Sequence, residues 1–157
     1  MDKLNCSVYE ISDTVEKLIS EGAVLNLCVS GVSMSPFLVS RRDIVYIRSF
    51  SDADLKKFSI LLFRRSDGSL VLHRVVKVLP DGRLVMNGDA QNWYETIDKK
   101  QVLAVVSEIE HNGKRSKSDS LYHNAVNMLW HLLLPIRPLI MRVWFKIRKT
   151  KNYNQSE

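Results

Sequence analysis

A serine-rich turn, a histidine and a group of acidic residues could together perform nucleophilic chemistry in this chain. The segment Ser30 to Pro36 consists mostly of small residues, and a tight turn there would expose the hydroxyl of Ser33 beside free backbone N–H groups. A serine hydroxyl attacks a carbonyl only when a base takes its proton and donors hold the resulting oxyanion. The backbone N–H of Ser33 is the natural donor, although an isolated serine-rich turn is usually structural.

A candidate base lies in the segment Val71 to Val76, where His73 interrupts a run of β-branched residues. With an ordinary pKa of about 6.5, a histidine is neutral near pH 7 and can accept the proton of a serine. The simpler interpretation is that an isolated histidine in a hairpin faces solvent. His73 is therefore a candidate base only in combination with Ser33.

A candidate acidic partner lies in or after the Gly-Asp turn of Asn87 to Asn92, which contains Asp89 and is followed by Glu95 and Asp98. A carboxylate beside the histidine would hold its tautomer and stabilise the imidazolium. Glycine, aspartate and asparagine also favour turns for conformational reasons alone.

The elements that must position these residues are predicted to be short β-strands. Ser66 to Gly68 and Pro80 to Gly82 are turn sequences between apolar runs, as in hairpins. Strands joined so closely are antiparallel, and we therefore predict a mainly β fold with a curled antiparallel sheet or barrel over residues 23–110. The predicted strands are Val24 to Val29, Asp43 to Arg48, Ser59 to Arg64, Ser69 to Leu79, Arg83 to Asn87 and Val102 to Ile109.

Helical segments are predicted on both sides of the β domain. Apolar residues at helical spacing over residues 8–19 predict a short amphipathic helix within residues 1–22, ending at Gly22. Residues 111–120 are predicted to be a linker, and residues 121–157 a basic amphipathic helical extension. Pro135 and Pro138 should break this extension into two pieces.

Composition limits the function classes. The 157 residues suffice for about one domain, and 45% hydrophobic with 25% charged residues is typical of globular proteins. Cys6 and Cys28 are the only cysteines and have no metal-site or disulfide spacing, which favours a reducing compartment. No metal or other cofactor is expected. The N-terminal residues lack the basic and apolar regions of a secretory signal, so we expect a cytoplasmic location.

The C-terminal extension carries much of the net charge of +6. Its cations interrupt the apolar run before the roughly 18 to 20 residues that a membrane span requires. Trp130 and Trp144 beside cations are typical of an interfacial helix, so residues 121–149 could bind an anionic membrane at its inner face. Packing of the same face on the β domain or on a second copy is an equally good reading. Because the cations alternate with large aliphatic residues, no nucleic-acid partner is expected.

The three segments together resemble the signal peptidase and LexA-like clan of serine peptidases over Val24 to about Ile109. Ser33 to Pro36 matches the S-M-x-P nucleophile box, and Arg42 to Val45 matches the box that follows the first hairpin. His73 to Val76 resembles the H-R-V box of the endoplasmic-reticulum and archaeal branch, which carries histidine in place of lysine. Gly88-Asp89 matches the G-D box. Four boxes in the family's order make the resemblance specific.

The resemblance implies a role for each box. Ser33 would attack and His73 would be the base, with acidic residues of the G-D box assisting. Asp89 matches the box itself, whereas Glu95 is the nearest residue to a second aspartate of the family, so the identity of the third member is open. Lys77 is a weaker candidate for the base, and we interpret it as solvated.

The turn that carries the nucleophile is also expected to bind substrate. Backbone and side-chain groups of Ser33, Met34 and Ser35 are expected to form the oxyanion and substrate-binding part of the site. Family substrates are extended peptides, and we expect one to add as a strand beside Ile44 to Arg48 or the turn ahead of Ser33. The expected activity is an endopeptidase that removes a leader or signal-like segment through an acyl-enzyme.

Two other functions remain open at this point. A typical signal peptidase has an N-terminal membrane span, which this sequence lacks, and Glu95 replaces an aspartate. The chain could therefore be a catalytically inactive peptide-binding or membrane-associated module of the same fold. A LexA-like self-cleaving regulator is less consistent, because about 22 residues before the β domain are too few for a DNA-binding module.

Overall fold

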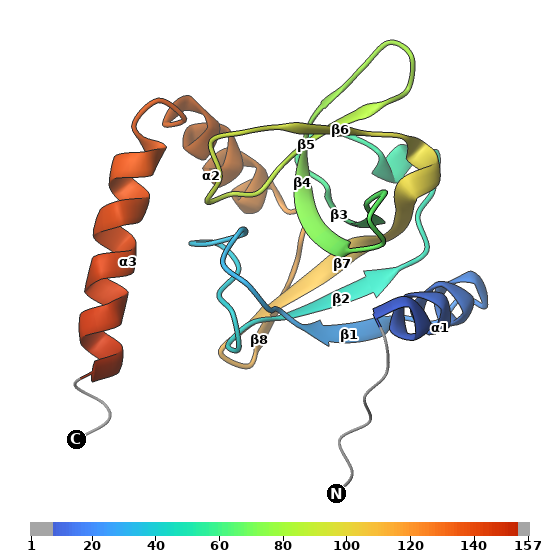
Figure 1. The fold of residues 1–157 in the computed structure, drawn as a ribbon, viewed down its shortest axis with the longest axis horizontal. Coiled ribbons are helices and arrows are strands. Elements are labelled where there is room, and N and C mark those ends of the chain that lie inside the picture. Colours follow the sequence, from blue (N-terminus) through green and yellow to red (C-terminus); the bar gives the residue numbers. More distant parts are fainter. Residues whose placement is uncertain (1–7, 154–157) are drawn as a thin grey trace, which may run out of the picture.

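The computed structural model describes residues 8–153, with side chains described for 13–120 and 125–148, and its largest element is one antiparallel sheet (Figure 1). The strands pair in the order β1-β2-β7-β3-β4-β5-β6, and β8 pairs with β7. The sheet curls but does not close into a barrel, and it confirms the predicted mainly β fold with helices at both ends. The strand bounds are β1 Leu25–Cys28, β2 Ile44–Arg48, β3 Ile60–Arg64, β4 Leu70–Val78, β5 Leu84–Asn87, β6 Glu95–Ile97, β7 Val102–His111 and β8 Lys114–Lys117.

Both faces of the central strand β3 are buried, because successive side chains enter two different parts of the core. Ile60 and Leu62 join the cluster that contains Met34 of the serine turn. Leu61 and Phe63 join the cluster under β4 to β6. The period of two along a strand thus divides one apolar run between two cores. The first of these cores anchors the turn that carries Ser33.

The N-terminal helix α1, Val8–Ser20, confirms the predicted amphipathic helix. Val15 and Ile19 are buried in the cluster that also holds Met34. The helix ends before Gly22, whose φ of 87° reverses the chain at an angle that few side chains adopt. Arg64 pairs with acidic residues on the exposed side of α1. The helix therefore packs as one cover of the sheet.

The stretch 111–120, predicted to be a linker, instead contains β8. Strand β7 continues to His111, and the chain reverses at Asn112 and Gly113. Strand β8, from Lys114 to Lys117, then pairs with β7. Asn112 and Gly113 have φ of 49° and 77°, as an Asn-Gly hairpin turn requires. The prediction was wrong because charge and serine content outweighed this Asn-Gly signal. Strand β6 was also not predicted.

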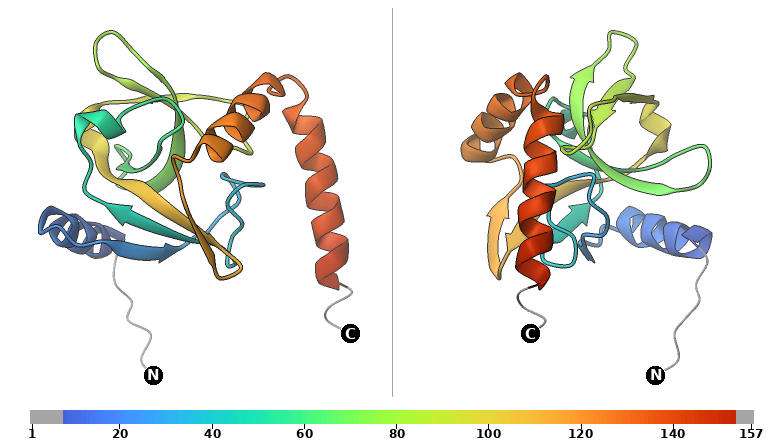
Figure 2. Two further views of the ribbon diagram at one scale, coloured as in Figure 1. Left: turned by 180° about the vertical axis from the view of Figure 1, so that it is seen from behind. Right: turned by 60° about the vertical axis from the view of Figure 1, so that its left-hand side comes forward.

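Two helices follow the sheet, α2 (Leu121–Leu132) and α3 (Arg137–Tyr153). They confirm the predicted division near Pro135. Among the described residues no single helix is long and apolar enough to span a membrane; Ala125–Leu132 and Arg137–Arg148 reach that length and composition only together, with a bend of 110° between them. Figure 2 shows α3 at the edge of the molecule in its left view and in front of the sheet in its right view.

Candidate active site

Ser33 lies in the turn after β1, and a second loop holds this turn in place. Gly31, with φ of 81°, allows the chain to reverse. The Ser33 carbonyl accepts a hydrogen bond of 2.8 Å from the N–H of Ala90. A Cβ on Gly88 would lie 2.7 Å from the same carbonyl oxygen. The Gly-Asp loop therefore packs on the serine turn backbone to backbone, and only glycine fits at position 88.

The three predicted turn residues differ in what they can offer a substrate. Ser33 is half-buried, and its N–H donates to none of the described residues. The N–H of Ser35 already donates to the Val32 carbonyl at 3.1 Å, and its buried hydroxyl has no hydrogen-bond partner in the described structure. Met34 is buried and contributes its side chain to a pocket wall. The turn thus keeps a backbone donor at Ser33 and not at Ser35.

His73, on β4, contacts a carboxylate at the start of β6. The distance from His73 Nδ1 to Glu95 Oε1 is 2.8 Å, and His73 is only 1% exposed. The rings of Phe63 and Trp93 flank the imidazole, with centroids 6.0 and 6.4 Å away. An ionised carboxylate can only accept hydrogen bonds, so Nδ1 carries the proton and Nε2 is left as an acceptor.

Glu95 is shared between His73 and Arg65, which directly follows β3. Arg65 Nε and Nη2 each donate to the Glu95 carboxylate at 2.7 Å. Burial by itself would raise the pKa of Glu95, but the hydrogen bonds and positive charge of Arg65 outweigh it and lower the pKa. Glu95 is therefore ionised at neutral pH and can hold the imidazole.

The protonation state of His73 follows from its surroundings. Burial lowers the pKa of His73 below its ordinary value of 6.5, and the hydrogen bond and charge of Glu95 offset burial only in part. The positive charge of Arg65 lowers the pKa further. The imidazole is therefore neutral at pH 7, which is the form that can accept a proton.

Asp89, the alternative acidic residue, binds a different partner. Its two carboxylate oxygens accept hydrogen bonds of 2.9 and 2.8 Å from Nε and Nη2 of Arg74, and both side chains are buried. Arg74 also donates to the carbonyl of Phe58 at 3.1 Å. Asp89, the residue that matches the G-D box, thus fixes the loop to β4, and Glu95 is the carboxylate that contacts His73.

Ser33 and His73 line the same pocket, whose volume is about 440 Å³. No hydrogen bond joins the two side chains, both of which are described. Catalytic hydrogen bonds are often long in a free enzyme and shorten in the Michaelis complex. The remaining lining residues are mostly aliphatic: Val15, Leu27, Val29, Met34, Val45, Leu62, Leu70, Val71 and Leu72, with Cys28, Ser30, Arg65 and Gln91.

Two strand edges border this pocket. Strand β1 pairs with β2 alone among the described strands, and β4 begins to pair with β5 only at Arg74, so Leu70 to His73 pairs with β3 alone. The predicted substrate edge at Ile44–Arg48 is wrong, because this strand, β2, pairs with β1 on one side and β7 on the other. The edge next to it that is available is one strand further out, at β1, directly before the serine turn.

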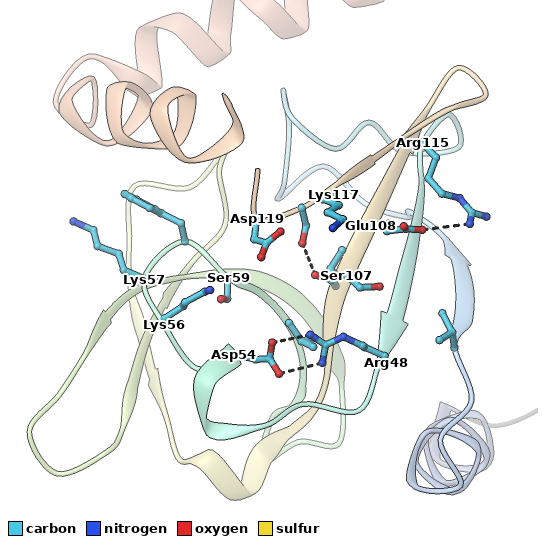
Figure 3. Close-up of a pocket in the computed structure, with 15 residues that line it drawn as sticks. Arg48, Asp54, Lys56, Lys57, Ser59, Ser107, Glu108, Arg115, Lys117 and Asp119 are labelled. Carbon is cyan, nitrogen blue, oxygen red and sulfur yellow. Dashed lines mark hydrogen bonds and ion pairs between the residues drawn. The ribbon is translucent and has the colours of Figure 1, made fainter. Parts of the chain in front are cut away.

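A second, larger pocket of about 600 Å³ contains no such arrangement (Figure 3). Two ion pairs join charged side chains of its lining, Arg48 with Asp54 at 2.8 Å and Arg115 with Glu108 at 3.3 Å. The hydroxyl of Ser107 donates to a backbone carbonyl at 3.1 Å, and no histidine lines this pocket. In the described part of the chain, no group of three or more His, Cys, Asp or Glu side chains could hold a metal ion.

Sequence reasoning missed the arginines that hold the site. Arg65 gave no signal, because a basic residue at a strand end is usually solvated. Arg137 was counted among the cations of the tail, but it is 1% exposed and donates to Asn87 Oδ1 at 2.7 Å and to the Gln91 carbonyl at 2.9 Å. A usable signal was its position at the start of a helix, where a cation is unfavourable unless something else binds it.

Comparison with known proteins adds no relative. No protein-family model, no curated protein and no solved structure matches this chain. The four sequence boxes and the geometry of the pocket are therefore the evidence for its function.

Proposed function

We propose that this chain is a serine endopeptidase with Ser33 as nucleophile, His73 as general base and Glu95 as the residue that orients His73. The observation that carries the proposal is one pocket lined by a half-buried serine and a buried histidine whose Nδ1 is bound by a carboxylate. The three side chains come from the turn after β1, from β4 and from β6. They are far apart in the sequence, and the fold brings them together. The four boxes that resemble the signal peptidase clan support the same roles.

The chemistry follows from the tautomer. His73 Nε2 takes the proton of Ser33 as Ser33 Oγ attacks the peptide carbonyl, and the Ser33 N–H donates to the oxyanion. The imidazolium, stabilised by Glu95, then gives its proton to the leaving amine as the C–N bond breaks. In the second half, His73 takes a proton from water, the resulting hydroxide attacks the acyl-enzyme, and Ser33 leaves with the proton returned by His73.

The shape of the pocket favours an extended peptide as substrate. A strand placed between the free edge of β1 and Leu70 to His73 of β4 could form main-chain hydrogen bonds with both. The aliphatic wall would accept small or apolar side chains of that strand. A leader or signal-like segment has this chemistry, because it is apolar and extended at its cleavage site.

Peptide cleavage by purified protein tests the proposal directly. Wild type, Ser33→Ala and His73→Ala are incubated with a library of short peptides that carry small or apolar residues, and products are read by mass spectrometry. We expect cleavage by the wild type alone, with a loss of at least about 10³-fold in each variant. Ser51→Ala, at an exposed serine outside the pocket, is the matched control and should cleave as the wild type does. Equal cleavage by wild type and Ser33→Ala would contradict the proposal.

A second candidate function is a catalytically inactive peptide-binding module. The observation in its favour is that no hydrogen bond joins Ser33 to His73. A fluorophosphonate probe separates the two functions, because it reacts with an activated serine and not with an ordinary hydroxyl. Labelling of Ser33 that disappears in His73→Ala supports the peptidase; absence of labelling together with retained peptide binding supports the inactive module.

A further inference from the structure

The helices α2 and α3 expose large apolar side chains that the β domain does not cover. Their exposed fractions reach 69% at Leu132 and 64% at Leu139 and Ile147. On α3, Leu139, Val143 and Ile147 recur at four-residue spacing and therefore share one face. The exposed apolar side chains of this region are Met128, Leu129, Leu132, Ile136, Leu139, Val143, Phe145 and Ile147. A patch of this kind on a small protein usually marks an interaction surface.

The charged side chains that the structure describes on α2 and α3 are all basic. Arg142 and Lys146 are exposed on α3, four residues apart on a face adjacent to the apolar one. Arg148 stacks on Trp144, with its guanidinium 5.1 Å from the ring centroid. Residues 121–156 contain no Asp or Glu. An apolar helix face bordered by cations and an amphipathic aromatic ring matches the boundary between lipid headgroups and acyl chains.

The helix pair is attached firmly to the loop that holds the serine turn. Arg137, at the start of α3, donates to Asn87 and to the Gln91 carbonyl, and Trp130 Nε1 of α2 donates to the Asp89 carbonyl at 2.8 Å. Arg137 also lies over the Trp130 ring, 5.3 Å from its centroid. Whatever binds the exposed face of these helices is therefore held at a fixed position relative to the pocket.

We propose that α2 and α3 form a docking surface for an anionic lipid bilayer, with Leu139, Val143 and Ile147 in the interface and Arg142 and Lys146 on lipid phosphates. A second copy of the chain fits less well, because residues 121–156 contain no Asp or Glu and a symmetric pairing of this face would bring the same cations together. The surface acts independently of the chemistry at Ser33, and in a peptidase it would present the pocket to substrates at the membrane.

Vesicle binding by the full chain tests the docking surface. Sedimentation with vesicles of phosphatidylglycerol and phosphatidylcholine is compared with pure phosphatidylcholine. Because each Lys or Arg at an anionic surface strengthens binding about fivefold, the double substitution of Arg142→Gln and Lys146→Gln should weaken binding to the anionic vesicles about thirtyfold. The matched control carries Lys77→Gln and Lys100→Gln, which remove the same charge from exposed positions of the β domain, and should bind within about twofold of wild type.

The apolar contribution is tested separately. Leu139→Ser with Val143→Ser changes two exposed side chains and should reduce binding to anionic vesicles at least about tenfold, with an unchanged circular dichroism spectrum. Ser33→Ala should bind as wild type does, so this experiment succeeds or fails independently of the peptidase proposal. Equal binding of the wild type to neutral and anionic vesicles, or no binding to either, would overturn the proposal. So would a dimer in light scattering that Leu139→Ser and Val143→Ser dissociate while vesicle binding is unchanged.

Discussion

The two carboxylates Asp89 and Glu95 lie close together in the sequence, are largely buried and bind an arginine each, yet their surroundings suit different tasks. Asp89 gives both oxygens to Arg74, and the pair is closed within the loop and β4. Glu95 binds Arg65 with both oxygens but also contacts His73. The difference is the third group, because an imidazole can change its protonation near neutral pH and a guanidinium cannot.

This contrast indicates how one loop region can combine support with chemistry. A closed arginine–carboxylate pair holds its charges in a single state, which stabilises a conformation once both are buried. A carboxylate shared with a histidine can respond when the histidine takes up a proton, and Arg65 keeps that carboxylate ionised meanwhile. We therefore expect substitutions at Asp89 to act mainly on stability and substitutions at Glu95 mainly on activity.

The largest effect is expected for Glu95→Gln. The amide can present an N–H to His73 and favour the wrong tautomer, and it no longer stabilises the imidazolium, so kcat/KM should fall on the order of 10³- to 10⁴-fold. Peptide cleavage followed by mass spectrometry measures this loss. Asp52→Asn removes a carboxylate from an exposed ion pair with Lys99 and should leave kcat/KM unchanged. A loss below tenfold in Glu95→Gln would remove Glu95 from the site.

The next effect is expected for Asp89→Asn, which leaves Arg74 buried without an opposite charge. We expect the free energy of unfolding to fall by about 3 to 5 kcal/mol, measured by urea denaturation. Asp81→Asn is the matched control, because Asp81 forms the same kind of pair with Arg83 at 2.8 Å on the surface, and its effect should be small. If Asp89→Asn instead kept its stability and lost activity as Glu95→Gln does, the contrast between the two carboxylates would be broken.

A smaller effect is expected in the pH dependence. Because burial lowers the pKa of His73, the acid limb of kcat/KM should have its midpoint below pH 6.5. The folded protein then binds this proton more weakly than the unfolded chain does, so the His73 contribution to stability decreases as the pH falls below 6.5. Arg65→Gln removes a positive charge that lowers the pKa of His73. It should move the acid limb to higher pH, and a limb that stayed in place would contradict the coupling of Arg65 to His73.

The smallest effect is expected for Lys77→Gln. A bulge between Val75 and Lys77 disturbs the alternation of β4, and Lys77 is exposed whereas His73 is buried. Activity should therefore remain within about twofold of wild type. A loss as large as that of His73→Ala, at unchanged stability, would make Lys77 the base and would reassign His73 to structure.

Much of the fold could be predicted because its signals are local. The hairpins at Gly68 and Gly82 require positive φ, and both glycines have it, at 84° and 85°. Strand β6 escaped prediction because its three residues are defined by pairing with β5, as in Met86 with Glu95. The site was predictable only in part for the same reason: turn and strand patterns indicate Ser33 and His73, but long-range register decides which carboxylate meets the histidine.

By itself, the sequence determined the mainly β class, the helices at both ends and the small set of residues to which chemistry could be assigned, because periodicity and turn residues act over short distances. Only the tertiary structure decided that Glu95 contacts His73 and that Asp89 forms an ion pair with Arg74. It also decided that Arg137, at the start of α3, is buried against the loop beside the site. These contacts join segments far apart in the chain, and their partners depend on strand register and on the burial of charges, which no local pattern encodes.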